Sequence, residues 1–228
     1  MSKIEGFYKS GSNSKGILFC HTLGGEPSQM FPLAKKFHKL GYTVSCPLYR
    51  GHGSTFMDML QTDVEDWYQD VKDAYDILKK EVETVFVVGM SIGGTLAVKL
   101  CEEENLAGLV TINAPVIGFD IENDVFTFQQ KENHADTIKR YREHRTTYFR
   151  FVTEIGQIDQ LRKIHCPMFV LQGSLDLSRY KTSSQLLMYY TSSKKKQRKD
   201  YAKSYHLLLQ DQDNKEAMND IVRFIETI

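Results

Sequence analysis

The stretch VFVVGMSIGGTLAVKL, residues 85–100, runs from an apolar segment through a glycine-rich turn into a helical pattern. Its first part, Val85–Val88, is nearly all apolar, which is typical of a central strand covered on both faces. The turn at 89–93 reads G-M-S-I-G, and a nucleophilic serine on such a sharp turn needs neighbours without side chains. We therefore predict a strand–turn–helix segment that presents Ser91 as a nucleophile.

Strand and helix patterns alternate on both sides of this stretch. Further strands are expected at 17–20, 42–46, 109–112 and 168–171, and further helices at 28–40, 64–78 and 218–228. Their alternation predicts an α/β fold with a mostly parallel, twisted sheet and helices on both faces. We expect a capping box of Thr62 and Glu65 to begin the helix at 64–78. The charge run 194–199 is expected to be a solvated loop that enters the last strand.

Residues 116–166 interrupt this alternation. The segment is rich in charged and aromatic residues and has no continuous apolar strand, so we expect two or three amphipathic helices that form a small cap. No linker composition or internal repeat occurs, and we expect a single domain over residues 1–228 with this insertion. We expect the aromatic residues of the insertion mainly to pack it onto the body and in part to line the site: Phe119, Phe126, Phe128, Tyr141, Tyr148, Phe149 and Phe151.

A serine hydroxyl needs a base that takes its proton. Among the seven histidines, His206 is placed best, because it follows the last expected strand, around 199–203, and precedes the final helix. The loops at the carboxyl ends of parallel strands share one edge of the sheet with the Ser91 turn. His52 lies in a second glycine-rich turn, and we expect it to have a structural role.

The base in turn needs a carboxylate that holds the imidazole in one tautomer. Asp176 follows the expected strand 168–171 and its turn, which gives the chain order Ser91, Asp176, His206. Asp120 follows the preceding strand and is the alternative acid. Stabilising the tetrahedral intermediate requires two N–H donors. We assign them to Ile92, the residue after the nucleophile, and to Leu23 in the loop after the first core strand.

Composition excludes several classes of protein. The 228 residues contain 29 Lys and Arg and 29 Asp and Glu, so a nucleic-acid binder with a basic excess is not indicated. No apolar run reaches the ~20 residues of a membrane span, and the first residues lack a signal core, so we expect a cytoplasmic protein without a stable membrane anchor. The four cysteines are scattered, and we expect reduced thiols and no metal site. The sequence indicates no oligomeric state.

Several of these segments together resemble the α/β-hydrolases, and more closely the small bacterial carboxylesterase and monoacylglycerol-lipase-like branch. The segments that carry the resemblance are His21–Gly25, Tyr49–Gly53, Asp66-Trp67, Gly89–Gly94, Asn113–Pro115, Asp176 and His206. The resemblance implies the α/β-hydrolase fold, a Ser-Asp-His esterase that uses no cofactor, a small-molecule ester substrate and a helical cap over an acyl pocket. The sequence departs from the family pattern in three places: Thr22 and Tyr205 stand where glycine is common, and no proline-bearing turn follows Asp176.

The expected function is therefore that of a serine carboxylesterase acting on short- to medium-chain monoesters. A thioesterase, an amidase or a carbon–carbon hydrolase would use the same three side chains, and pocket shape would decide between these reactions. A ligand-binding protein without catalysis is a further alternative, because a fold does not fix a function. The intact set of Ser91, Asp176 and His206 disfavours this last alternative.

Overall fold

The computed structural model describes residues 4–118 and 135–228, and of residues 135–142 it describes only the helical backbone. A seven-stranded sheet has the order β1-β3-β2-β4-β5-β6-β7. The strands are β1 (Phe7–Lys9), β2 (Lys15–Cys20), β3 (Thr43–Cys46), β4 (Thr84–Met90), β5 (Gly108–Ile112), β6 (Met168–Gly173) and β7 (Lys196–Tyr201). All neighbouring strands pair in parallel except β1, which is antiparallel to β3. The prediction of a mostly parallel sheet is confirmed.

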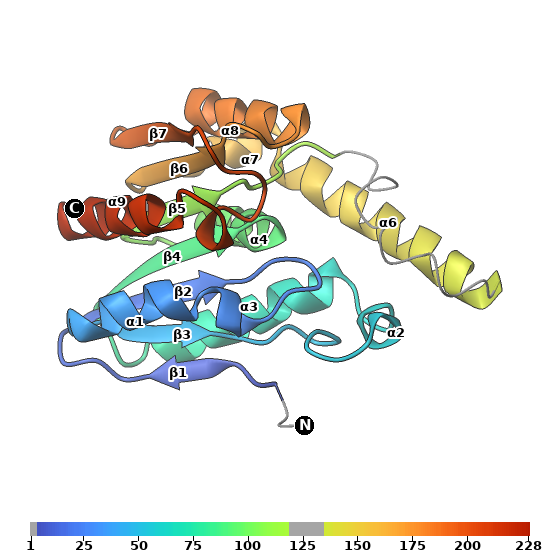
Figure 1. Cartoon of the computed structure of the whole chain (residues 1–228), viewed down its shortest axis with the longest axis horizontal. Coiled ribbons are helices and arrows are strands. Elements are labelled where there is room, and N and C mark those ends of the chain that lie inside the picture. The colour runs from blue at the N-terminus through green and yellow to red at the C-terminus, as the bar shows by residue number, and fades with distance from the viewer. Residues whose placement is uncertain (1–3, 119–134) are drawn as a thin grey trace.

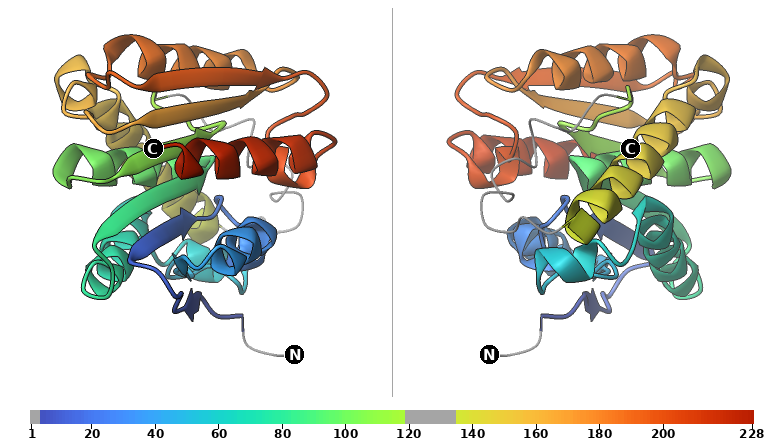
Figure 2. Two further views of the ribbon diagram at one scale, coloured as in Figure 1. Left: turned by 90° about the vertical axis from the view of Figure 1, so that its left-hand side faces the viewer. Right: turned by 90° about the vertical axis from the view of Figure 1, so that its right-hand side faces the viewer.

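Helices connect the strands and cover both faces of the sheet (Figures 1 and 2). The α-helices are α1 (Phe31–Lys39), α2 (Phe56–Met59), α3 (Val64–Leu78), α4 (Ile92–Glu103), α6 (Ala135–Ile155), α7 (Ile158–Leu161), α8 (Ser178–Tyr190) and α9 (Asn214–Glu226). The described residues also include the short 3-10 helices η1 (Pro27–Gln29) and η3 (Leu208–Gln210).

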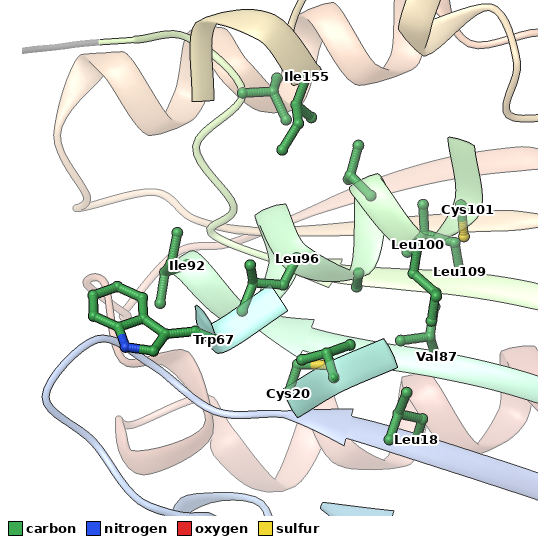
Figure 3. Packing of buried hydrophobic residues seen from close by; sticks show 14 of the residues in the cluster. Leu18, Cys20, Trp67, Val87, Ile92, Leu96, Leu100, Cys101, Leu109 and Ile155 are labelled. Atoms are coloured by element: carbon green, nitrogen blue, oxygen red, sulfur yellow. The ribbon is translucent and has the colours of Figure 1, made fainter. Parts of the chain in front are cut away.

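Two apolar cores lie on opposite faces of the sheet. The first joins the sheet to α3, α4, α8 and the described end of α6, and Figure 3 shows part of it, with Trp67 of α3 and Leu96 of α4 among its members. The second joins the sheet to α1 and α9, through buried residues such as Phe37 and Ile221. Strand β4 supplies side chains to both cores, because successive residues of a strand point to opposite faces. The apolar run at 85–88 is therefore explained by burial on both sides.

The predicted capping box of Thr62 and Glu65 is wrong by one residue. The N-cap of α3 is Asp63, whose carboxylate accepts hydrogen bonds from the backbone N–H groups of Glu65 and Asp66. The hydroxyl of Thr62 has other partners, because it accepts a hydrogen bond from the indole N–H of Trp67 and donates to backbone carbonyl groups. Because its hydroxyl is already hydrogen-bonded, Thr62 does not cap α3, and the neighbouring Asp63 does.

The predicted loop at 194–199 is also partly wrong, because four of its residues belong to β7. This strand lies at the edge of the sheet and pairs with β6 alone. One charged side chain of β7, Lys199, binds the carboxylates of Glu216 and Asp220 on α9. Charged residues are common on edge strands, where they oppose pairing with another chain.

Helices α6 and α7 occupy the described part of the insertion at 116–166. Figure 1 shows α6 running obliquely away from α7 on the side of the molecule where α2 also lies. The side chains of Val152 and Ile155 are buried in the first core. Among the aromatic residues expected to pack the insertion, Tyr148 and Phe151 are buried and Phe149 is exposed. Phe119, Phe126 and Phe128 lie outside the described residues, and for Tyr141 only the backbone is described. Assignment of the whole insertion as a cap stays a prediction.

All four cysteines are free thiols, and Cys20, Cys46 and Cys101 are buried. Among the described helices, none is both long enough and apolar enough to cross a membrane.

Candidate active site

Ser91 lies between the end of β4 and the start of α4, on a backbone with φ of 55° and ψ of −127°. A positive φ is costly for a residue with a side chain, and such conformations gather at functional sites. The flanking glycines make the turn possible. A Cβ on Gly89 would lie 2.1 Å from the carbonyl oxygen of Gly93, and a Cβ on Gly93 would lie 2.2 Å from that of Cys20. The sequence pattern G-x-S-x-G thus reflects close contact between backbone segments.

The structure brings Ser91, His206 and Asp176 together in one hydrogen-bonded chain. Nδ1 of His206 lies 2.9 Å from Oδ2 of Asp176, and Nε2 lies 2.8 Å from Oγ of Ser91. Because a carboxylate only accepts hydrogen bonds, the proton of a neutral imidazole sits on Nδ1. Nε2 is then the acceptor for the serine hydroxyl. The three residues come from the loops after β4, β6 and β7, at the edge of the sheet where the sequence analysis expected them.

Burial and hydrogen bonds fix the carboxylate of Asp176. The residue is 6% exposed. Its Oδ1 accepts a hydrogen bond from the N–H of Leu177 at 2.8 Å. The ring of Tyr180, in the first turn of α8, packs against the imidazole of His206 with the centroids 4.1 Å apart. Tyr180 was not predicted as part of the site. Its position only four residues after Asp176 could have indicated that it lies close to the site.

Asn113 is a second residue of the site that the sequence analysis left without a role. It is fully buried at the end of β5 and has a φ of 50°. Its amide NH2 donates to the carbonyl oxygens of Tyr205 and His206, and its Oδ1 accepts from the N–H of Gly173. One side chain therefore connects the ends of β5 and β6 to the loop that carries His206. Only the long-range pairing of these loops reveals this role.

The predicted N–H donors belong to two different segments of the chain. Ile92 is the first residue of α4. The N–H groups in the first turn of a helix have no hydrogen-bond acceptor within that helix. Leu23 lies in the loop after β2 and lines the same cavity as Ser91. His21, just before it, is fully buried. Burial lowers the pKa of His21 to about 3, so the ring is neutral. Its Nδ1 lies 3.0 Å from the backbone carbonyl oxygen of Thr22.

His52, for which we expected a structural role, has a different environment from His206. Its ring lies 5.3 Å from that of His21 and 4.9 Å from that of Trp67, measured between centroids. Burial lowers the pKa of His52 to about 4, and its Nδ1 lies 3.2 Å from the carbonyl oxygen of Arg50. Within the described part of the chain, the ring of His52 thus contacts His21, Tyr49 and Trp67 and makes no hydrogen bond to Ser91. The alternative acid, Asp120, lies outside the described residues.

A cavity of about 580 Å³ opens beside Ser91. This volume lies within the range of small-molecule sites. Most of its lining is apolar, and it includes Leu23, Tyr148, Leu175, Leu177, Tyr180 and Leu207. Tyr148 comes from α6, so the insertion contributes to the wall. Within the described ranges, no group of three or more His, Cys, Asp or Glu side chains is placed to hold a metal ion.

Comparison with protein families gives a match over residues 11–140 to the model described as serine aminopeptidase, S33. Among curated proteins, the chain is 41% identical over 117 residues to a thermostable monoacylglycerol lipase of Bacillus sp. (strain H-257). That match covers 51% of this chain and 46% of the lipase. The chain is also 25% identical over 232 residues to a carboxylesterase of Bacillus subtilis (strain 168), with 94% and 93% of the two chains covered.

Two solved structures show the same fold over nearly the whole chain. One, from work on the metagenome-derived lipolytic enzymes LipS and LipT, has a TM-score of 0.84 at 23% identity and covers 99% of this chain and 98% of that chain. The other is the monoacylglycerol lipase of Paleococcus ferrophilus, with a TM-score of 0.74 at 16% identity and coverage of 97% and 98%. At these identities the likeness concerns the fold.

Proposed function

Because the chain belongs to the family described as serine aminopeptidase, S33, we propose that it is a serine carboxylesterase that hydrolyses short- to medium-chain monoesters through an acyl-enzyme. The coarser assignments are established: the chain has the α/β-hydrolase fold and is a serine hydrolase of the lipase and esterase type. The resemblance found in the sequence is thereby confirmed. The observation that carries the finer proposal is the hydrogen-bonded chain from Ser91 through His206 to Asp176, beside an apolar cavity.

In the proposed reaction, Oγ of Ser91 attacks the ester carbonyl carbon while Nε2 of His206 takes the hydroxyl proton. His206 returns this proton to the leaving alcohol, and an acyl-enzyme remains. Water then attacks the acyl-enzyme with His206 again as the base, which restores the serine. Asp176 orients the ring through Nδ1 and stabilises its charged form. The N–H groups of Leu23 and Ile92 hold the oxyanion in both halves of the reaction.

The test compares an aryl ester, a thioester and an anilide that carry the same acyl group. We expect the ester to have the highest kcat/KM, because a phenolate leaves without prior protonation and an amine does not. Faster cleavage of the thioester or the anilide would move the protein to that class of hydrolase. In parallel, a fluorophosphonate probe followed by peptide mass spectrometry should label Ser91 in the native chain.

The matched variants are Ser91→Ala and Ser28→Ala. Ser91→Ala should lose nearly all turnover and all labelling while it keeps the thermal stability of the native chain. Ser28 is exposed, and its hydroxyl pairs with Glu26, so its replacement should change neither readout. A native chain that the probe leaves unlabelled and that hydrolyses no substrate would favour a ligand-binding protein.

A further inference from the structure

Thr22, which stands where the family usually has glycine, is 96% buried, and its two hydrogen-bond donors share one acceptor. Its backbone N–H and its hydroxyl both donate to Oε1 of Gln29, at 3.3 and 3.0 Å. Gln29 is the last residue of η1, so this pair closes the loop that begins after β2. The loop carries Leu23 directly after Thr22. The backbone conformation of the loop at Thr22 therefore depends on the side chain of Gln29, seven residues further along the chain.

The chemistry of the pair fixes how the amide of Gln29 is turned. A backbone N–H can only donate, so the amide atom that faces Thr22 is the oxygen. The remaining loop is built around this contact. A Cβ on Gly25 would lie 2.2 Å from Oε1 of Gln29 and 2.4 Å from Oγ1 of Thr22. The N–H of Gly25 donates to the carbonyl oxygen of Thr22, which also faces the ring of His21. Gln29 thus completes a network that encloses Thr22.

The same residue also joins the two sides of the active site. The amide of Gln210, four residues after His206, donates to the backbone carbonyl oxygen of Gln29 at 3.1 Å. Gln29 and Leu23 both line the cavity beside Ser91. The segment that carries the base and the loop that carries Leu23 are therefore connected through Gln29. A connection of this kind maintains the relative placement of groups that act on one substrate.

We propose that Gln29 is a positioning residue of the oxyanion hole, and that it acts by holding Thr22 so that the N–H of Leu23 points at the developing oxyanion. The inference rests on the proposed function, in which Leu23 supplies one donor. Both acylation and deacylation pass through an oxyanion, so loss of this support slows whichever half is rate-limiting. Binding of the ground-state ester does not use the hole to the same extent, so KM changes little.

The experiment measures kcat and KM for p-nitrophenyl butyrate, and Ki for a trifluoromethyl ketone whose adduct with Ser91 carries an oxyanion. The variants are Gln29→Leu, which has no acceptor for Thr22, and Gln29→Glu, which keeps an acceptor oxygen and loses the NH2 group. For Gln29→Leu we expect kcat to fall ~10-fold or more and Ki to rise by a similar factor, with KM changed less than ~3-fold. For Gln29→Glu we expect kcat within ~3-fold of the native value.

Ser28→Ala, a change of the exposed neighbour, is the control and should leave all three constants unchanged. Thermal unfolding of each variant separates a local effect from loss of the fold. Native kcat in Gln29→Leu overturns the inference, and a rise in KM alone makes Gln29 a substrate contact instead. Failure of Gln29→Glu to restore kcat overturns the inference as well, because that variant retains the acceptor. A native chain that cleaves no ester overturns the proposed function itself, which is a distinguishable result.

Discussion

Asn113 places a single amide between the loop of the base and the ends of two strands. Replacing it with aspartate keeps the acceptor for the N–H of Gly173 and sets a carboxylate oxygen against the carbonyl oxygens of Tyr205 and His206. We expect Asn113→Asp to lower kcat roughly 10- to 100-fold, because a small displacement of the base misaligns its contact with Ser91. Steady-state kinetics on a soluble ester measures this effect.

Asn113→Gly is the companion variant, because glycine adopts the positive φ of this position without strain. It removes the side chain without adding a charge, and we expect an intermediate loss of kcat. If Asn113→Asp turned over at the native rate, the amide would be a structural link without influence on the base.

Replacement of Asp176 tests the assigned acid. In Asp176→Asn the amide NH2 group faces Nδ1 of His206, so the proton moves to Nε2 and the ring can no longer accept from Ser91. We expect kcat to fall roughly 10³- to 10⁴-fold, as the wrong tautomer of the base predicts. Asp120→Asn is the control and should keep most of the activity. A larger loss in Asp120→Asn than in Asp176→Asn would exchange the roles of the two residues.

Glu102, on α4, is a buried carboxylate outside the active site. Its side chain is 1% exposed, and neither carboxylate oxygen has a hydrogen-bond partner within the described part of the chain. Burial raises the pKa of Glu102 from 4.5 to about 8, although Lys99 lies 3.8 Å away. The folded chain therefore holds a proton that the unfolded chain releases. This group favours folding below pH 4.5, and its contribution is lost as the pH rises towards 8.

Glu102→Gln mimics the protonated carboxyl group and removes this dependence. We expect it to change the free energy of unfolding little at pH 4 and to raise it by roughly 2–4 kcal/mol at pH 8, since each pKa unit corresponds to 1.36 kcal/mol. Guanidinium unfolding at both pH values measures the difference. Glu83 is exposed, and Glu83→Gln should show no such trend. An equal effect of Glu102→Gln at both pH values would rule out a buried proton.

Polar contacts of two different kinds attach the described end of helix α6 to α2 and α3. Nε2 of His144 is hydrogen-bonded to the backbone carbonyl oxygens of Met59 and Thr62, and its ring lies 5.4 Å from that of Trp67. Arg150, two turns further on, pairs with Glu65 at 2.7 Å, and both side chains are exposed. Loss of the half-buried His144 contact removes a hydrogen bond from the carbonyl oxygen of Thr62, whereas the carbonyl oxygen of Met59 keeps hydrogen bonds from the N–H and hydroxyl of Thr62.

We expect His144→Leu to weaken the attachment of α6 by about 1–2 kcal/mol, because it removes a hydrogen bond from the partly buried carbonyl oxygen of Thr62. Amide hydrogen exchange over residues 143–155 should speed up accordingly. Tyr148 lies one turn away in the cavity wall, so KM for longer acyl esters should rise as well. Arg150→Gln removes an exposed ion pair and should cost less than about 1 kcal/mol. Equal exchange rates in the two variants would contradict this ranking.

The elements that the sequence predicted correctly are the buried ones. Strand β4 and helix α3 have apolar residues at the spacing that burial imposes, and this pattern can be read without knowing their partners. The edge strands differ. The three residues of β1 and the charged β7 pair on one side only, so their sequences lack the apolar run that the prediction relied on. These edge strands form because they pair with a neighbouring strand, and the local sequence does not encode that pairing.

The candidate site shows the same division. The proximity of Ser91, Asp176 and His206 could be predicted because Ser91 and Asp176 follow recognisable apolar strands and His206 precedes the final helix. Parallel strands then present their carboxyl ends at one edge of the sheet. Asn113 and Gln29 could not be predicted in the same way. Each of them forms hydrogen bonds with the backbone of a segment that lies nearby only in the folded chain. Neither belongs to a sequence pattern that predicts its hydrogen-bond partner.

The whole molecule sets the length of acyl chain that fits beside Ser91. The cavity has a volume of about 580 Å³ and a largely apolar wall. Each methylene buried there contributes ~0.8 kcal/mol at most, so kcat/KM should rise up to ~4-fold per carbon and stop where the cavity ends. Aryl butyrate, octanoate and palmitate, compared with an emulsified triglyceride, test this expectation. Triglyceride turnover equal to that of the best monoester would place the protein among lipases.

The hydrogen bonds from Ser91 to His206 and from His206 to Asp176 span 115 and 30 residues of chain. Contacts between such distant residues form late in folding, because closing long loops costs conformational entropy before any contact is gained. We therefore expect hydrolysis to return during refolding only when β4, β6 and β7 have all paired. The single tryptophan, Trp67, lies on α3, which packs against β2 and β3 and needs neither β6 nor β7 for these contacts. We therefore expect its fluorescence to recover before catalysis does.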